Sequence, residues 1–222
     1  MAADSILIGC DVVIKEMAHR IGDHLKIHVI DPSLHVNPDR LRKTIQETIE
    51  AVEQSFGTIL LGFGYCSRAA EGLRSRNSKI VIPLVHDCVG LFLGSRSAHT
   101  DMIKTEPGSF FLSKGWVEAG TTPFEEYRYM VKRYGEKKAD SLMNAMLRHY
   151  QLLKFIRTEN TRACTHHRRY AREKALKFGL NYQEILGNTA LFDDLINKND
   201  NDELRTIRPG ECIRYDMFFN KT

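Results

Sequence analysis

Two hydrophobic patterns alternate through the first half of the chain. Short, almost continuous apolar runs are typical of strands buried in a parallel sheet, and the stretches between them repeat apolar residues at helical spacing. The expected strands are residues 5–9, 26–31, 58–64, 79–85 and 109–113. The expected helices are residues 12–21, 39–54, a short one from about 67, and one from 88 that Gly94 interrupts. This alternation predicts repeated βα units and a parallel sheet.

The second half of the chain is richer in helical spacing. We expect helices at residues 125–134, 137–150, 162–178 and 191–196, and strands at residues 154–158, 181–186 and 204–207. No linker or internal repeat separates the two halves. We therefore expect one α/β domain over residues 1–222, a three-layer fold with a mostly parallel sheet of Rossmann-like βα units. Its parallel-sheet core would span residues 1–120 and its more helical C-terminal portion residues 121–222.

Composition and charge are ordinary for a globular protein, with 42% hydrophobic residues, 27% charged residues and a net charge of +4. No window approaches the roughly 18 consecutive apolar residues that a membrane-spanning helix needs. The first residues lack the basic region of a secretory signal, so we expect a cytoplasmic protein without a membrane partner. Five cysteines, an odd number, in such a chain argue against a disulfide framework and leave reduced thiols.

Three of these cysteines occupy equivalent places in the expected βα units. Cys10 follows the first strand, Cys66 follows the third, and Cys88 follows the fourth. If the strand order is 2-1-3-4-5, these strands are neighbours about 4.8 Å apart, and their carboxyl ends meet at the edge where α/β sheets bind ligands. We predict that the three thiols hold a metal or cluster. Buried structural cysteines and a redox or nucleophilic cysteine are the alternatives, and the chain has no CxxC pair typical of structural zinc sites.

The chemistry of three thiolates narrows the choice of metal. We expect helix N-termini after Cys66 and Cys88 to lower the pKa of these thiols and to favour the thiolate. Soft ligands favour zinc, an iron–sulfur cluster or copper(I), and three of them leave one coordination position open. The sequence does not choose between zinc and iron–sulfur.

Polar residues near the cysteines are the expected lining of a cleft. His86 is a candidate ligand or general acid/base, or a histidine bonded to backbone at a strand end. Asp87, the second candidate catalytic residue, would orient His86 or cap the following helix. The expected substrate-binding residues are Tyr65, Ser67, Arg68, Ser95 and Arg96. Cys164 and Cys212 lie outside the pattern.

Basic residues crowd the segment from 162 to 177. A solvated helix face is the simple interpretation of such a cluster, and a site for an anionic ligand is the alternative. Few aromatic residues are interleaved with it, and no known nucleic-acid motif is present, so we do not expect a nucleic-acid partner.

Several motifs together resemble a known family. They are GCDVV (9–13), LLGFGYC (60–66), IPLVHDC (82–88), LFLGSR (91–96) and PGSFFLSKGW (107–116), with YAREKA from Tyr170 and RPGE from Arg208. This set is similar to the family called domain of unknown function 1638 and covers almost the whole chain. Phe63 and Ser67 stand where the family pattern has tyrosine and glycine. The resemblance implies proteins of anaerobic bacteria and archaea, often in settings of corrinoid-dependent methyl transfer.

These observations give one leading hypothesis and one alternative. The first is a metal- or iron–sulfur-dependent protein that binds or transforms a small substrate at an open coordination position, as a lyase, hydrolase or transferase if it is an enzyme. The second is an accessory protein that binds a corrinoid or another tetrapyrrole, with corrinoid or methyltransferase proteins as partners.

Overall fold

The computed structural model describes residues 4–158 and 164–219. Contacts within the chain divide it into two compact units. The first unit contains residues 1–99 and 188–222, and the second contains residues 100–187. The boundary expected at residue 120 therefore falls inside the second unit. That residues 1–222 act as one domain stays a prediction.

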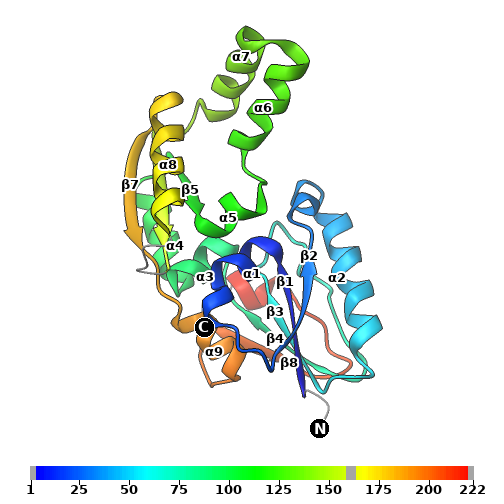
Figure 1. The fold of residues 1–222 in the computed structure, drawn as a ribbon. Helices are drawn as coiled ribbons and strands as arrows, with labels where there is room; N and C mark the ends of the chain where they lie inside the picture. Colours follow the sequence, from blue (N-terminus) through cyan, green and yellow to red (C-terminus); the bar gives the residue numbers. More distant parts are fainter. Residues whose placement is uncertain (1–3, 159–163, 220–222) are drawn as a thin grey trace. The chain divides into compact units, whose positions relative to one another are not determined.

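The first unit is built on a five-stranded sheet with the order β2-β1-β3-β4-β8 (Figure 1). Its strands are β1 (Ser5–Cys10), β2 (Lys26–Ile30), β3 (Thr58–Gly62), β4 (Lys79–Pro83) and β8 (Leu204–Ile207). The first four run parallel, and β8 is antiparallel to β4.

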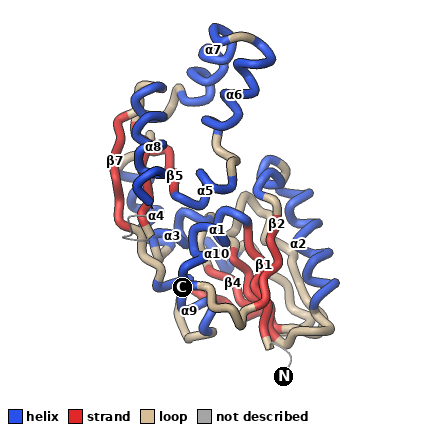
Figure 2. Tube along the Cα trace, viewed as in Figure 1, coloured by secondary structure: helices blue, strands red, loops and turns tan. Residues whose placement is uncertain are grey.

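Helices cover both faces of this sheet, with α2 on one side and α1 and α9 on the other (Figure 2). The helical elements of this unit are α1 (Asp11–Met17), η1 (Ala18–Arg20), η2 (Pro32–Val36), α2 (Pro38–Val52), α3 (Cys88–Leu93), α9 (Ala190–Asn197) and α10 (Asp216–Phe219). The helix α4 (Arg96–Thr105) crosses the boundary between the units. Leu41, Ile45 and Ile49 form the buried stripe of α2, at the helical spacing that the sequence predicts.

The second unit has its own parallel sheet, with the order β5-β6-β7. Its strands are β5 (Ser109–Ser113), β6 (Leu152–Arg157) and β7 (Asn181–Leu186), and its helices are α5 (Lys114–Ala119), α6 (Pro123–Tyr134), α7 (Glu136–Leu147) and α8 (Thr165–Lys177). Leu112 and Phe155 pack with α6, α7 and α8 in a separate apolar core.

The α/β class, the mostly parallel sheet and the order of the first four strands are confirmed. The expectation that residues 109–113 form the fifth strand of the same sheet is wrong, because β5 pairs with β6 over five residues. The strand that pairs with β4 at this position is β8, which lies near the C-terminal end of the chain. Local patterning identifies a strand, but packing decides which partner it takes, here one 43 residues away (Ser109 with Leu152) or 127 residues away (Ile80 with Ile207).

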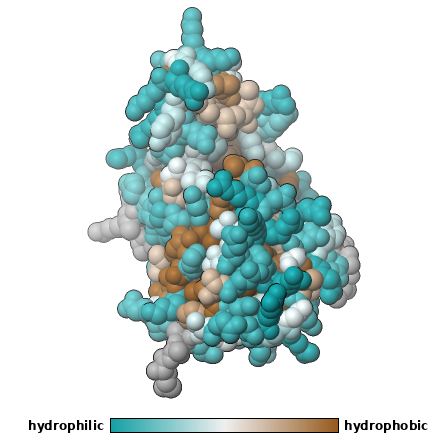
Figure 3. All heavy atoms as spheres, turned by 90° about the vertical axis from the view of Figure 1, so that its right-hand side faces the viewer, coloured by the Kyte–Doolittle hydropathy of each residue, from teal (hydrophilic) through white to brown (hydrophobic). Residues whose placement is uncertain are grey.

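The described surface carries both polar and apolar side chains (Figure 3). No helix in the described ranges is both long and apolar enough to cross a bilayer. The face in Figure 3 is mostly hydrophilic, with apolar side chains gathered in limited areas between polar ones. Exposed apolar residues of the first unit include Ile27 and Val29 on the outer strand β2, and Val36.

A buried carboxylate ties α2 to the strand that precedes the Cys88 loop. Glu53 follows α2, and its Oε2 accepts hydrogen bonds of 2.6 Å from both the Ser75 hydroxyl and the Arg76 amide. The Ser78 hydroxyl donates to the carbonyls of Glu53 and Phe56. The hydrogen bonds that the Glu53 carboxylate accepts, first the one from Ser75 and then the one from the Arg76 amide, lower the pKa of Glu53 despite its burial. The segment before β4 is thereby fixed against the end of α2.

We predict that Glu53→Gln lowers the free energy of unfolding by about 1–3 kcal/mol at pH 7, the usual effect of losing bonds to a buried charge. The pKa of Glu53 is lower in the folded state than in the unfolded chain, where it is about 4.3. The contribution of the Glu53 carboxylate to the free energy of unfolding is therefore complete above that pH and is lost as the pH falls below it. Urea unfolding at pH 7 and pH 4 measures this difference. The control is Glu50→Gln on the exposed side of α2, and an equal effect of the two substitutions would contradict the assignment.

Candidate functional site

The three cysteines of the sequence hypothesis lie at one edge of the first sheet. Cys10 is the last residue of β1, Cys66 follows β3 in the next loop, and Cys88 is the first residue of α3 after β4. Because β1, β3 and β4 are adjacent and parallel, their carboxyl ends meet at the same edge.

The three thiols also share one electrostatic environment. Negative charge on Cys10 raises the pKa of Cys66, and negative charge on either of these raises the pKa of Cys88. Cys10 and Cys66 are buried, and Cys88 is partly buried. The strand geometry thus brings the three thiols within mutual electrostatic reach.

The state of these thiols differs from the expectation. Burial raises the pKa of Cys10 to about 11 and that of Cys66 to about 12, and it also raises that of Cys88 well above the usual value. The expected lowering by helix N-termini is wrong, because no helix follows Cys66 and because desolvation outweighs other influences at Cys88. Without a bound cation the thiols are protonated at neutral pH.

The loop that carries Cys66 has an unusual backbone. Cys66, Ser67 and Arg68 have φ angles of 46°, 55° and 79°, all in the left-handed region. Each such residue costs about 1–2 kcal/mol when it is not glycine. Strain of this kind persists where surrounding structure imposes it, often at functional sites. The short helix expected from residue 67 is therefore a left-handed turn, which a local apolar pattern does not reveal.

Backbone hydrogen bonds impose that turn. The amides of Tyr65 and Cys66 donate to the carbonyls of Val85 and His86, both at 2.9 Å. Gly64 permits this approach, because a Cβ at that position would lie 2.6 Å from the Val85 carbonyl oxygen. The Cys66 loop and the segment that leads to Cys88 are therefore held as a pair.

The donor set fits a soft metal by its chemistry. In the described ranges, however, no group of three or more His, Cys, Asp or Glu side chains is arranged so that it could hold a metal ion. A four-iron cluster spreads its cysteine ligands over a wider triangle than a single ion does, because each thiolate binds a different iron. Residues Cys10, Cys66 and Cys88 would hold such a group.

His86 and Asp87 have distinct surroundings. The His86 ring packs against Phe219, with centroids 5.0 Å apart. Oδ1 of Asp87 accepts from the Val89 amide at 2.9 Å, so the capping role weighed for Asp87 is confirmed. The same Oδ1 lies 3.5 Å from Nδ1 of His99, and burial lowers the pKa of His99.

The candidate substrate-binding residues divide into two groups. The hydroxyl of Tyr65 and Nε of Arg68 both donate to Glu71, at 3.0 and 3.1 Å. Ser67 is exposed beside them. In the second group, the Ser95 hydroxyl accepts from the Ala98 amide at 3.0 Å, and Nη1 of Arg96 donates to the Phe218 carbonyl at 2.8 Å.

The sequence analysis missed His99 and the C-terminal aromatic residues. Tyr65 contacts Phe218 and Phe219, with centroids 5.1 and 4.9 Å apart, and Arg96 anchors the same helix α10. The helix α10 therefore covers Tyr65 and His86. Its sequence, DMFF, is too short for a periodicity signal, and His99 lies in a helix without other buried residues among those described.

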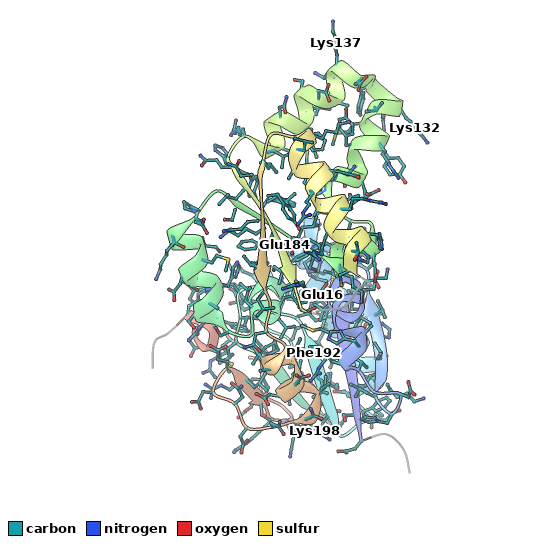
Figure 4. The ribbon with its side chains drawn as sticks, turned by 60° about the vertical axis from the view of Figure 1, so that its left-hand side comes forward. Glu16, Lys132, Lys137, Glu184, Phe192 and Lys198 are labelled. Carbon is teal, nitrogen blue, oxygen red and sulfur yellow. The ribbon has the colours of Figure 1, made fainter. Side chains whose placement is uncertain are left out.

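The remaining cysteines and the basic segment lie apart from this edge. Cys212 is exposed, and Cys164 belongs to the second unit. In the basic helix α8, Arg168 and Arg172 both contact Glu184 of β7, labelled in Figure 4, at 2.8 Å. The guanidinium groups of these two arginines thus serve packing within the second unit.

We predict that Ser67→Gly raises the free energy of unfolding by about 0.5–1 kcal/mol, because glycine relieves the left-handed strain without removing a thiol. Ser141→Gly in the exposed part of α7 is the matched control and should lower it by a few tenths of a kcal/mol. Denaturant unfolding of the metal-free protein measures both. Equal destabilisation by the two substitutions would show that the turn is not strained.

A second prediction concerns thiol reactivity in metal-free protein. At pH 8 iodoacetamide should modify exposed Cys212 at least about a hundredfold faster than Cys10 or Cys66, because burial and a raised pKa leave these two with little thiolate. Mass spectrometry of the labelled peptides gives the rates. Comparable rates at Cys66 and Cys212 would contradict the buried environment.

Comparison with known proteins adds a family but no activity. No curated protein and no solved structure matches the chain. The family model described as protein of unknown function (DUF1638) matches residues 29–196, which is most of the chain and includes Cys66, Cys88 and the whole second unit. The chain therefore belongs to the family of proteins of unknown function called DUF1638.

Proposed function

We propose that this protein holds an iron–sulfur cluster or a zinc ion on Cys10, Cys66 and Cys88 and uses it to bind or transform a small substrate. The observation that carries the proposal is the placement of three cysteines at the carboxyl ends of three adjacent parallel strands, with Cys10 and Cys66 within electrostatic reach of Cys88. A parallel α/β sheet binds its ligands at that edge.

The electrostatics support a cationic occupant. Burial and then the carboxylate of Asp87 raise the pKa of Cys66 and Cys88, and the neighbouring thiols raise it further, Cys10 at Cys66 and both Cys66 and Cys10 at Cys88. A metal reverses this balance, because its positive charge stabilises thiolates. The left-handed turn at Cys66 is a second support, since the strain is retained where the position of one side chain matters.

A zinc ion and an iron–sulfur cluster both accept three thiolate ligands, and the metal analysis below distinguishes them. Three protein ligands leave one position open, and a bound metal would act there as a Lewis acid on a substrate atom.

The surrounding residues then have proposed roles. His86 would move a proton near that open position, and Asp87 would fix the start of α3 and with it Cys88. Tyr65, Ser67, Arg68, Ser95 and Arg96 would line the approach to the site. With such a site, the proposed activity is that of a lyase, hydrolase or transferase.

The corrinoid alternative is the weaker proposal. It needs basic side chains to bind the peripheral carboxylates of the tetrapyrrole, and Arg168 and Arg172 already contact Glu184. We therefore place binding of a corrinoid, and partnership with methyltransferase proteins, second.

Metal analysis and the visible spectrum of anaerobically purified protein test the proposal. We predict brown protein with iron and sulfide, and loss of most of the bound metal in Cys10→Ser, Cys66→Ser and Cys88→Ser, because serine stays protonated and is a poor ligand for soft metals. Colourless protein with stoichiometric zinc would select the zinc form, and red protein would select the corrinoid.

Two controls make this test specific. Cys164→Ser replaces a buried cysteine elsewhere, and Cys212→Ser replaces an exposed one, so both should keep full metal content. Full metal content in all three site variants would refute the proposal. Loss in only two of the three would remove the third cysteine from the ligand set.

A further inference from the structure

The second unit has its own parallel sheet, and this sheet has a carboxyl edge. The strands β5, β6 and β7 run parallel, so their carboxyl ends lie at one edge, where parallel α/β sheets bind ligands. β5 ends at Ser113 and passes directly into α5. Neither the cysteine site nor the family match assigns a role to this edge.

Ser113 is the first unexplained group there. It is fully buried at 0% exposure and occupies the N-cap position of α5, where a serine hydroxyl normally accepts from the helix backbone. Its hydroxyl makes no capping bond and has no hydrogen-bond partner in the structure as described. A buried hydroxyl without a partner costs about 1–3 kcal/mol, and such groups are commonly satisfied by a bound ligand, ion or water.

His167 is the second such group. It continues the inward-facing stripe of α8 formed by Ala171 and Ala175, which pack in the apolar core. His167 is only 3% exposed, and its Nδ1 atom has no hydrogen-bond partner within the described chain. Its Nε2 lies 3.2 Å from Oε1 of Glu118, within ion-pair distance. Nδ1 has no comparable contact with an acidic group in the described ranges.

These groups belong to one place in the fold. Glu118, which contacts His167, lies in the short helix α5 that starts next to Ser113. The pKa of His167 is lowered first by burial, then by the charge of His166, and also by the charge of Lys114. Glu118 raises it. Lys114 directly follows Ser113, so the imidazole is within electrostatic reach of the end of β5. The imidazole therefore has positive neighbours in His166 and Lys114 and one negative neighbour in Glu118.

The helix α8 favours the same kind of ligand. It has 13 residues and no acidic residue in its first turn, and His167 lies in that turn. Helix N-termini attract anions through their amide groups and dipole. In the protonated ring, Nε2–H would donate a hydrogen bond to Glu118, and Nδ1–H would donate one to a bound anion. The imidazolium would then lie between two negative partners.

We infer that the carboxyl edge of β5, β6 and β7 binds a small oxyanion, a carboxylate or a phosphate-like group, which accepts hydrogen bonds from the Ser113 hydroxyl and the His167 imidazole. This site lies wholly in the second unit and does not depend on the proposed metal at the cysteines. It gives a specific function to the start of the basic helix, whose later arginines contact Glu184.

Sulfate and malonate are the probes for this site, as a tetrahedral oxyanion and a dicarboxylate. We expect saturable shifts of the His167 ring signals when the full chain is titrated at constant ionic strength and followed by NMR, with the ring moving toward its protonated state. His167→Gln and Ser113→Ala should each weaken binding at least about tenfold, the effect of losing a hydrogen bond to a charged group. Binding of one probe alone identifies the ligand class and supports the site.

The control is His149→Gln, which replaces an exposed histidine beside the opposite end of β5. It should leave both affinities within about twofold. Ser113→Ala removes only one buried hydroxyl, so it keeps the test available if His167→Gln does not fold. The inference is overturned if neither probe gives saturable shifts, or if Ser113→Ala binds both probes as tightly as the unaltered protein.

Discussion

Parallel pairing of β3 with β1 and β4 is the constraint on which the candidate site depends. It places three loops that are far apart in sequence at one edge, with a cysteine in each. Antiparallel insertion of any one strand would send its cysteine to the opposite edge of the sheet. The backbone bonds from Tyr65 and Cys66 to Val85 and His86 then join two of these loops directly. Strand order gives proximity, and these bonds give the finer placement.

Burial has two opposing consequences at this edge. It excludes water, which strengthens every electrostatic interaction there, and it makes three neighbouring thiolates unfavourable. The pKa of each of these cysteines is raised mainly for this reason. A cationic group removes the conflict, because it compensates the charge that burial penalises. The same logic applies to the second unit, where the buried Ser113 hydroxyl and Nδ1 of His167 have no hydrogen-bond partner in the described chain.

The two units use one architectural principle for different chemistry. Each has a parallel sheet with its own core, and each gathers polar or ionisable side chains at the carboxyl ends of the strands. Soft thiols are collected in the first unit. In the second, a hydroxyl and an imidazole lie in basic surroundings that suit an oxyanion.

The sequence by itself determined the strands, most of the longer helices and the class of the fold. Residues 181–186 and 204–207 are strands to the residue, and the α2 stripe has the expected spacing, because periodicity records which side of an element is buried. It also placed Cys10, Cys66 and Cys88 near the ends of three expected strands, since the distance of a residue from a strand is a local feature of the chain. Only the tertiary structure decided that β8 occupies the place beside β4, that Cys66 lies in a left-handed turn, and that α10 covers Tyr65. These features depend on contacts between residues distant in sequence and on desolvation. Neither of these produces a periodic pattern of hydrophobic residues in the sequence.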